Sequence, residues 1–296
     1  MINKTAMTAV VGRPNVGKST LVNALVGEKI AIVSPKPQTT RSRIFGVFER
    51  DDTQIILLDT PGFHKARTRL GDFMVKTVNE SVADVDAVLL VVEPVDNIGT
   101  QEELLIERIR ASGAPAVLVI NKTDTVKKEE LLPVIARYNE AFEFSAVVPV
   151  SAKTGDGLDA LVSEIVGFSQ ESEPLFPDDM ITDQPERQIC AELVREKLLM
   201  TLDREVPHGT AVEVTRFSQR DSGIIDMDVT IYCEKASHKG IIIGKNGASL
   251  KRIGELARRD IEKFMGEKVC LKTWVKVKEN WRDNDILIKN FGFTDD

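Results

Sequence analysis

Residues 12–19 read GRPNVGKS, which matches the pattern GxxxxGK[ST]. An apolar run over residues 6–11 precedes the match and a helix-like pattern over residues 19–26 follows it, so the motif joins a strand to a helix. Such loops hold phosphates with backbone N–H groups and with the N-terminal end of the helix. We expect Lys18 to reach the β- and γ-phosphates of a nucleotide and Ser19 to bind Mg²⁺. The other nucleotide-binding residues expected in this loop are Gly12, Asn15, Val16, Gly17 and Thr20.

The first 170 residues alternate short apolar runs with longer segments of mixed polarity. The expected strands are 6–11, 54–58, 87–92, 116–120 and 147–150, and the expected helices are 19–26, 71–82, 101–111, 128–142 and 158–168. Strands that are apolar throughout are buried on both faces. Their alternation with helices predicts an α/β domain over residues 1–170, with a doubly wound, mainly parallel sheet of the P-loop type.

A second domain is expected after an acidic segment. Residues 171–185 contain three prolines and no hydrophobic period, so they are interpreted as a linker. Residues 186–279 then show the order helix, strand, strand, helix, helix, strand, which predicts an α+β domain. Residues 280–296 have no clear period and are expected to form a C-terminal tail.

A second magnesium contact is expected where residues 59–62 read DTPG, directly after an apolar run. A carboxylate such as Asp59, at the carboxyl end of a parallel strand, is suited to contact Mg²⁺ through water. The Gly62 N–H can face a γ-phosphate and sense its presence. The motif predicts that the metal and the terminal phosphate are held together.

A polar, proline-containing loop spans residues 32–43. A loop of this length is typically functional or disordered. One of its threonine hydroxyls can join Mg²⁺ when a γ-phosphate is present, and Thr40 is favoured over Thr39 for this role. We expect this loop and residues 62–71 to order around the γ-phosphate and to reposition the second domain.

The base is predicted from residues 121–124, which read NKTD and follow an apolar run. An Asp124 carboxylate can accept hydrogen bonds from the N1–H and N2 amino groups of guanine, and adenine has neither donor there. Asn121 can hold the base or a neighbouring loop, and the Lys122 stem can cover the purine face. These residues favour GTP and GDP over adenine nucleotides.

Residues 151–153 read SAK and follow the expected strand 147–150. The Ala152 N–H can donate to guanine O6, and Ser151 and Lys153 complete the expected base site. The tripeptide is uninformative alone, but as the last of four motifs in this order it supports GTP.

The hydrolytic machinery is less evident from the residues. Phe63 follows DTPG, where Ras-like GTPases place a glutamine that orients water, and a phenyl ring cannot polarise water. His64 is interpreted as a surface residue rather than as a base. Intrinsic hydrolysis is therefore expected to be slow. Two interpretations of Asn15 stay open: its side-chain oxygen binds K⁺, or it is an ordinary residue of the loop.

The second half contains a GxxG motif, GKNG, at residues 244–247, between an apolar run and a helix-like segment. This is the arrangement of a K homology (KH) domain, whose GxxG loop clamps about four nucleotides of RNA. The expected RNA contacts are Gly240, Ile243, Gly244, Lys245, Asn246, Gly247, Lys251 and Arg252. Trp274 and Trp281 could also stack on bases, although a place in the core is favoured for Trp274.

The charge distribution agrees with this division. The chain carries 39 basic and 46 acidic residues, a net of −7. Residues 186–296 hold 20 basic and 19 acidic residues, so they contribute +1 and residues 1–185 contribute −8. Residues 235–282 hold 13 basic and 5 acidic residues, a net of +8. An acidic average therefore hides a basic segment suited to a phosphate backbone.

The three cysteines are widely separated and the N-terminal segment shows no secretory pattern. Neither a disulfide framework nor a zinc site is indicated, and a cytoplasmic location is expected.

Together GRPNVGKST, PQTTR, DTPGF, NKTD and SAK, followed by HKGIIIGKNG, resemble the Era family of bacterial GTPases over essentially the whole chain. The resemblance implies a type II KH domain that binds the 3′ end of small-subunit ribosomal RNA, with GTP favouring RNA binding. It also implies a role in maturation of the small ribosomal subunit and peripheral contact with the cytoplasmic face of the inner membrane. A hydrophobic residue after DTPG is usual in that family. We expect a monomer that binds no DNA.

Two other functions are weighed against this one. The first is a GTPase of the RNA-modification type, whose second domain serves an enzyme. The second is a membrane-associated signalling GTPase whose C-terminal half binds protein. The second half shows no further set of nucleophiles, metal ligands or cofactor motifs, which disfavours a second enzymatic activity.

Overall fold

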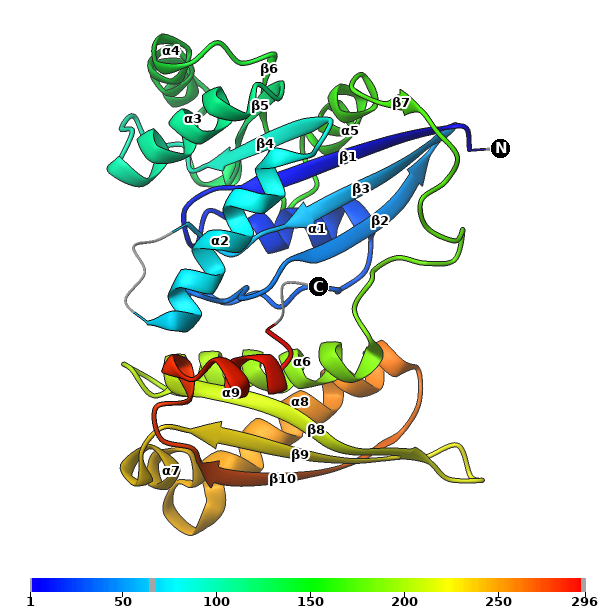
Figure 1. Ribbon diagram of the computed structural model, residues 1–296, viewed down its shortest axis with the longest axis vertical. Helices are drawn as coiled ribbons and strands as arrows, with labels where there is room; N and C mark the ends of the chain where they lie inside the picture. The colour runs from blue at the N-terminus through cyan, green and yellow to red at the C-terminus, as the bar shows by residue number, and fades with distance from the viewer. Residues whose placement is uncertain (1, 64–67, 294–296) are drawn as a thin grey trace. The chain divides into compact units, whose positions relative to one another are not determined.

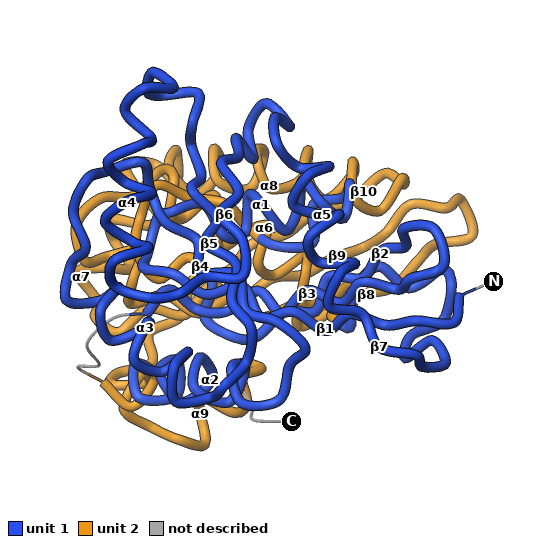
Figure 2. Tube along the Cα trace, turned by 90° about the horizontal axis from the view of Figure 1, so that it is seen from above, with its two compact units in different colours: residues 1–31, 40–66, 71–183 blue, residues 32–39, 67–70, 184–296 orange. Residues whose placement is uncertain are grey.

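The structure is a computed structural model that describes residues 2–63 and 68–293 (Figure 1). These residues divide into two compact units, which Figure 2 colours separately. Unit 1 comprises residues 2–31, 40–63 and 71–183, and unit 2 comprises residues 32–39, 68–70 and 184–293. The polar loop predicted over residues 32–43 is thus shared between the two units.

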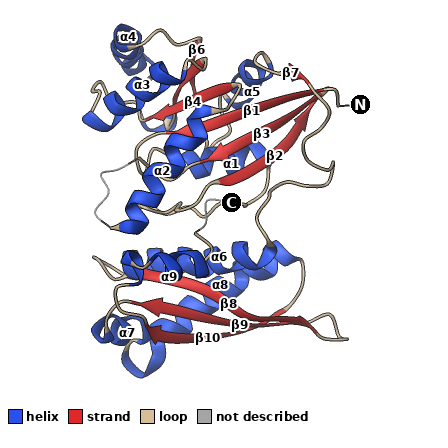
Figure 3. Cartoon of the chain, in the orientation of Figure 1, coloured by secondary structure: helices blue, strands red, loops and turns tan. Residues whose placement is uncertain are grey.

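Unit 1 is built on a sheet whose main strands follow the order β2-β3-β1-β4-β5-β6 (Figure 3). Their bounds are β1 Lys4–Val11, β2 Ile44–Arg50, β3 Thr53–Asp59, β4 Ala87–Val92, β5 Ala116–Ile120 and β6 Ala146–Pro149. β2 runs antiparallel to β3, and the other neighbours in this order are parallel. A short strand, β7 (Gln170–Glu171), pairs antiparallel with β1. The prediction of a doubly wound, mainly parallel sheet is confirmed.

The helices of unit 1 cover both faces of this sheet. They are α1 Lys18–Val26, α2 Arg69–Ala83 (whose first two residues are grouped with unit 2), α3 Thr100–Ser112, α4 Leu131–Ala141 and α5 Leu158–Val166. Successive side chains of β4 enter opposite cores: Leu89 packs with α1 and α5, whereas Leu90 packs with α2, α3 and α4. This alternation explains why the central strands are apolar at every position.

β2 is absent from the strands that the sequence pattern predicts. Its sequence, IFGVFER, contains a glycine and ends in two charged residues, so it lacks the continuous apolar run of the central strands. Residues predicted as a linker run beside this part of the sheet. The Val47 N–H donates to Ile181 O at 2.9 Å, and Gln54 Nε2 donates to Phe176 O at 2.8 Å. The division between the units falls after Asp183, within the predicted linker 171–185.

Unit 2 contains a three-stranded sheet of order β10-β9-β8 with helices packed on one face. Its elements are α6 Glu186–Thr201, β8 Thr210–Gln219, β9 Ile225–Cys233, α7 Ala236–Ile243, α8 Ala248–Met265, β10 Val269–Val277 and α9 Asp285–Asn290. β10 is parallel to β9, and β8 is antiparallel to it. The predicted order of helices and strands is confirmed. Short 3-10 helices in the two units lie at Thr123–Thr125, Lys128–Glu130, Pro207–Gly209, Lys245–Gly247 and Trp281–Asp283.

The two tryptophans occupy opposite environments. Trp281 is fully buried, and its Nε1–H donates to Gly209 O at 3.0 Å. Trp274 is 56% exposed, so the expectation that it lies in the core is wrong. In β10 the side chains of Val269 and Val275 enter the core with the helices. Side chains alternate along a strand, so Trp274 lies on the other face of the sheet.

Among the residues that the structure describes, no helix combines the length and the apolar character needed to cross a membrane.

Candidate functional site

The loop between β1 and α1 is held in shape by a lysine side chain that bonds to carbonyl groups of the same loop. Lys18 Nζ donates to Gly12 O at 3.1 Å and to Arg13 O at 3.2 Å, so the side chain folds back over the loop. Gly17 has φ +98°, and an added Cβ would lie 2.3 Å from Asn121 Nδ2. No other residue therefore fits at that position. A buried ammonium beside the N-terminus of α1, where Ser19 and Thr20 lie in the first turn, is suited to a phosphate group.

Asn121 joins three loops at the carboxyl edge of the sheet. Its Nδ2 donates to Val16 O at 2.9 Å, and its Oδ1 accepts the Ala152 N–H at 3.0 Å. The sequence left open whether Asn121 holds the base or a loop, and the structure places it between loops. The Ala152 N–H, predicted to face guanine O6, has this amide oxygen as its partner.

The residues expected around the base lie on adjacent loops after β5 and β6. The Ser151 hydroxyl donates to Asp124 Oδ1 at 2.8 Å, which links the two loops. Lys122 Nζ donates to Asn15 O at 2.7 Å, so its stem runs from the base-binding loop towards the phosphate loop. Lys153 is exposed beside them. Asp124 is also exposed, so its carboxylate is accessible to a ligand.

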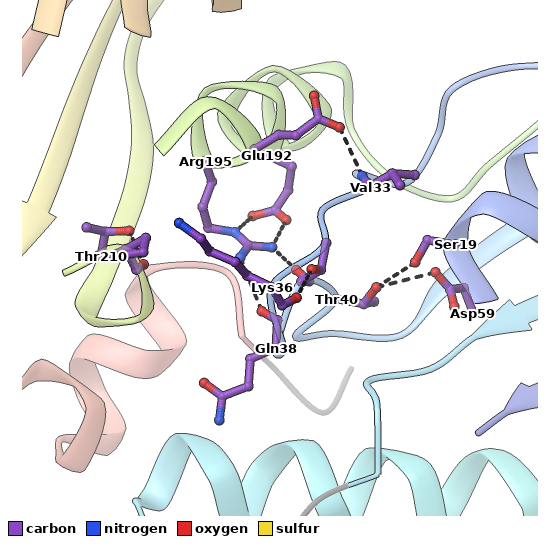
Figure 4. Close-up of polar contacts among 12 residues, drawn as sticks. Ser19, Val33, Lys36, Gln38, Thr40, Asp59, Glu192, Arg195 and Thr210 are labelled. Carbon is purple, nitrogen blue, oxygen red and sulfur yellow. Dashed lines mark hydrogen bonds and ion pairs between the residues drawn. The ribbon is translucent and has the colours of Figure 1, made fainter. Parts of the chain in front are cut away.

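Three oxygen-bearing side chains gather beside Lys18. Ser19 Oγ lies 2.8 Å from Thr40 Oγ1, which in turn lies 3.5 Å from Asp59 Oδ2 (Figure 4). Thr39 points elsewhere, because its hydroxyl donates to Lys36 O at 2.7 Å. Within the described part of the chain, the buried Asp59 Oδ1 has no hydrogen-bond partner. Two hydroxyls and a carboxylate oxygen with spare acceptor capacity fit Mg²⁺, which prefers oxygen ligands.

Burial perturbs both charged groups of this cluster. Desolvation raises the pKa of Asp59 to about 6, although the positive charge of Lys18 opposes the change. Desolvation likewise lowers the pKa of Lys18 to about 8, and Asp59 opposes that change. A triphosphate would bring negative charge to Lys18 and a metal would bring positive charge to Asp59. The buried charges therefore fit a nucleotide that carries Mg²⁺.

The DTPG segment packs tightly against the phosphate loop. A Cβ at Gly62 would fall 2.8 Å from Pro14 Cα. The Phe63 N–H donates to Gly12 O at 3.2 Å, and its buried ring lies 4.3 Å below the Arg108 guanidinium carbon. Phe63 thus anchors the segment rather than activating water. His64 lies outside the described residues.

An ion-pair network, which the sequence did not predict, connects the loop after β1 and the loop after β5 to the end of β4 and to α3. Glu93 pairs with Lys122 Nζ at 2.5 Å and with Arg13 Nη2 at 2.6 Å, and Arg13 Nε lies 3.1 Å from Glu102. The available signal was an acidic residue directly after the wholly apolar strand β4, Ala87–Val92. Because the carboxyl ends of parallel strands share one edge, Glu93 falls among the nucleotide loops.

The GxxG segment connects α7 to α8 in unit 2. Gly244 ends α7 and Gly247 precedes α8, both with positive φ. A Cβ at Gly244 would lie 2.7 Å from Ser249 Cβ, so the tight turn requires glycine. Lys245 and Asn246 at the tip are exposed. The two flanking glycines have no side chain and the two residues at the tip are exposed, so the backbone of the loop is open to a ligand.

The predicted RNA contacts around this loop form an accessible surface. Gly240 has open space around its Cβ position, and Ile243 is half-buried at the end of α7. Lys251 and Arg252 are exposed in the first turns of α8, as are Arg258 and Arg259 further along. In the described part of the chain, no carboxylate pairs with Lys245, Lys251 or Arg252. These cations are therefore available to phosphate groups.

Comparisons with known proteins agree with this geometry. A family model described as a 50S ribosome-binding GTPase matches residues 7–122, and a KH domain model matches residues 205–282. The GTPase Era of Clostridioides difficile (strain 630) is 50% identical over 294 residues, which cover 99% of each chain. The chain belongs to the Era GTPase family. It is accordingly a GTPase, and the predictions of the family and of the fold are confirmed.

Two solved Era structures resemble this one over nearly their whole length. The first is a variant of Aquifex aeolicus Era bound to GDP and aluminium fluoride, with a TM-score of 0.94, 38% identity and coverage of 98% of this chain and 99% of that one. The second is Era in complex with MgGDPNP and nucleotides 1506–1542 of 16S ribosomal RNA. Its TM-score is 0.95 at 38% identity, and the match covers 99% of this chain and 100% of that one. Both solved relatives hold a guanine nucleotide, and the second also holds Mg²⁺.

Proposed function

We propose that this Era-family chain is a GTP-operated switch that binds the 3′ end of small-subunit ribosomal RNA and assists maturation of the small ribosomal subunit. The observation that carries the proposal is an exposed GxxG loop, flanked by exposed cations, in a chain that also holds a full set of nucleotide loops. The Era relative seen with MgGDPNP and a 16S RNA fragment supports both the ligand class and the pairing of the two activities.

In the nucleotide site, each side chain has a defined task. Lys18 holds the terminal phosphates, and Ser19, Thr40 and Asp59 hold Mg²⁺, which when bound neutralises charge on the phosphates. The Gly62 backbone packs closely against Pro14 of the phosphate loop, so its N–H would be available to a γ-phosphate bound there. Loss of the γ-phosphate removes the ligand that keeps Thr40 and Gly62 in place, which makes the site a switch.

In the RNA site, the loop acts through shape and charge. The glycines at 244 and 247 allow a phosphate backbone to approach closely, and Lys245 and Lys251 supply positive charge. The N-terminus of α8 adds its partial positive charge at the same place. Trp274 is exposed on the other face of the sheet, so it is not part of this clamp.

Potassium is proposed as a third component of the nucleotide site. Asn15 is exposed and has φ +69°. Its carbonyl accepts from Lys122 Nζ at 2.7 Å, which holds its backbone in place and keeps the residue at the rim of the phosphate loop. A side-chain oxygen at that rim is a suitable ligand for a monovalent cation beside the β- and γ-phosphates.

The proposed place of action is the cytoplasm, where ribosomal subunits are assembled, and the proposed form is a monomer. Contact with the inner membrane rests on the family resemblance alone. Sedimentation of the purified chain, and flotation with anionic lipid vesicles, test these two points.

The RNA assignment is tested with the double variant Lys245→Asp/Asn246→Asp. Asp tolerates the left-handed backbone of Asn246 (φ +52°), so the fold should persist. We expect binding to an RNA of the 16S 3′ end to fall at least about tenfold, because positive charge in the clamp is replaced by negative charge. Binding of GDP should not change.

A matched control is Lys263→Asp/Asn280→Asp. It makes the same substitutions at an exposed lysine of α8 and at an exposed left-handed asparagine (φ +52°), both outside the GxxG loop. Equal RNA affinity in the two double variants would contradict the clamp. It would favour the rival in which the second unit binds a protein.

A further inference from the structure

Phe63, the residue that follows the DTPG segment, is held at two points within unit 1. Its N–H donates to Gly12 O of the phosphate loop at 3.2 Å. Its ring is 6% exposed and belongs to the same core cluster as Val78 of α2 and Leu105 of α3. The backbone of Phe63 is therefore fixed to the phosphate loop, and its side chain is fixed in the core beneath two helices.

The guanidinium group of Arg108, in α3, covers this ring. Its central carbon lies 4.3 Å from the centroid of the Phe63 ring, and Nη1 donates to Asn79 Oδ1 of α2. The Arg108 side chain is half-buried, so water screens the attraction between the cation and the ring less than at a fully exposed site. Arg108 thus joins α3 to α2 and holds the ring in the core.

Helix α3 carries a second arginine that lies over a phenylalanine ring. The guanidinium carbon of Arg110 lies 5.7 Å from the centroid of the Phe142 ring, and Nη2 donates to Ala141 O at 2.9 Å. Phe142 follows the last residue of α4 and belongs to none of the nucleotide-binding motifs. The two arginines make similar contacts from one helix, but the ring under Arg108 belongs to the residue that follows Gly62.

The position of the Phe63 ring bears on Gly62 through one peptide unit. The carbonyl of Gly62 and the N–H of Phe63 lie in a single rigid plane. An added Cβ at Gly62 would fall 2.8 Å from Pro14 Cα, so the Gly62 backbone packs closely against the phosphate loop. A ring that was free to leave the core would release this plane. Gly62 would then lose the position from which its N–H can reach a γ-phosphate.

We propose that Arg108 is a positioning residue for GTP hydrolysis. By holding the Phe63 ring in the core, it keeps the Gly62 N–H at the place where a γ-phosphate binds. This role rests on the proposed function of Gly62 as the sensor of the γ-phosphate. It gives a task to the apolar side chain that stands where Ras-like GTPases place a glutamine, because the ring anchors the segment instead of orienting water.

The first test compares Arg108→Met, Arg108→Lys and Arg110→Met in the full-length chain. Met keeps an apolar stem and removes the cation that faces the ring. We expect Arg108→Met to lower kcat for GTP about fivefold, as for the loss of one partly buried cation–π contact. Arg108→Lys restores a cation and should be intermediate. Arg110→Met breaks the matching pair and should keep kcat within about twofold of the unsubstituted chain.

The difference between nucleotides separates positioning from a purely structural role. Arg108→Met should weaken binding of GDPNP about fivefold and leave GDP binding within about twofold, because Gly62 is needed only with a γ-phosphate. Equal weakening of both nucleotides, or an unchanged kcat with a lowered melting temperature, would overturn the role of Arg108. If Arg108→Met does not fold, Arg108→Lys carries the same comparison.

A double-variant cycle with Phe63→Leu tests whether Arg108 acts through the ring. Leu keeps an apolar side chain in the core but offers no ring to the guanidinium group. If the ring transmits the effect, Arg108→Met added to Phe63→Leu lowers kcat no further. Additive losses would overturn the proposed role of Arg108.

The variant Gly62→Ala distinguishes a failure of this role from a failure of the assignment beneath it. Slow hydrolysis in Gly62→Ala together with an unchanged kcat in Arg108→Met would overturn the role of Arg108 and leave the assignment of Gly62 intact. Unchanged hydrolysis in Gly62→Ala would overturn the assignment of Gly62, and the role of Arg108 with it.

Discussion

The Ser151 hydroxyl donates a hydrogen bond to Oδ1 of Asp124 at 2.8 Å. These residues follow different strands of unit 1, so the bond joins the two loops that are proposed to surround guanine. It orients one carboxylate oxygen of Asp124 while the side chain as a whole stays accessible. The base therefore meets an acceptor that is already in position, which lowers the ordering cost of binding.

Asp124→Asn should weaken GTP binding by at least about a hundredfold, because a site built for hydrogen bonds discriminates strongly once a partner is lost. The amide can instead donate to the O2 carbonyl of xanthine, so xanthosine triphosphate should become the better ligand. Competition between the two nucleotides at equilibrium checks this. Ser151→Ala should cause a much smaller loss without changing the preferred base. Retained preference for GTP in Asp124→Asn would contradict the guanine assignment.

Asp59→Asn should stabilise the nucleotide-free protein in a way that depends on pH. The folded-state pKa of Asp59 is raised to about 6 from its ordinary value of 3.8, so the buried carboxylate disfavours folding above pH 6 and has no effect below about pH 4. The gain in unfolding free energy should be at most about 3 kcal/mol at pH 8, since Lys18 also loses a neighbouring charge. Melting temperatures measured in EDTA at pH 8 and pH 5 test this. A gain that does not shrink at the lower pH would show that ionisation is not its cause.

Gly62→Ala should slow hydrolysis and weaken binding of GDPNP, and it should leave GDP binding nearly unchanged. The added Cβ would lie 2.8 Å from Pro14 Cα, so the segment must move away from the phosphate loop and from a γ-phosphate. A suitable control is Gly254→Ala in α8, where the Cβ would make only an ordinary contact at 3.8 Å with Thr273. Wild-type hydrolysis in Gly62→Ala would remove the proposed role of this glycine.

Hydrolysis should be faster in KCl than in NaCl of equal concentration if the Asn15 side chain binds K⁺. Asn15→Ala should abolish that difference, and its rate in NaCl should stay near that of the unsubstituted chain. Single-turnover rates at saturating GTP isolate this effect from nucleotide affinity. A difference between the salts that persists in Asn15→Ala would place the cation elsewhere, and equal rates in the unsubstituted chain would exclude it.

The sequence predicted the central architecture well because the buried parallel strands are apolar at every position and the motifs follow their carboxyl ends. It missed β2, whose pattern is broken by Gly46 and by a charged end. It misplaced Trp274, because a large aromatic side chain in a strand does not reveal which face of the sheet it occupies.

The contacts of Arg195 and Glu196 in α6 could not be predicted from the sequence, for a different reason. Arg195 and Glu196 are almost completely buried, whereas a helical pattern places charged residues on the solvent face. Their partners come from residues 33–39, more than 150 positions earlier in the chain. Only the folded chain brings these groups together, so no local pattern could have indicated them.

If the protein is a GTP-operated switch, its nucleotide state controls its affinity for RNA, and a comparison of two nucleotide states can decide this. The affinity of the full-length chain for an RNA of the 16S 3′ end should be measured with saturating MgGDPNP and again with MgGDP at the same salt concentration. We expect tighter RNA binding with GDPNP than with GDP, and by linkage an equal preference for GDPNP over GDP when RNA is bound. Identical RNA affinity in the two nucleotide states would contradict it.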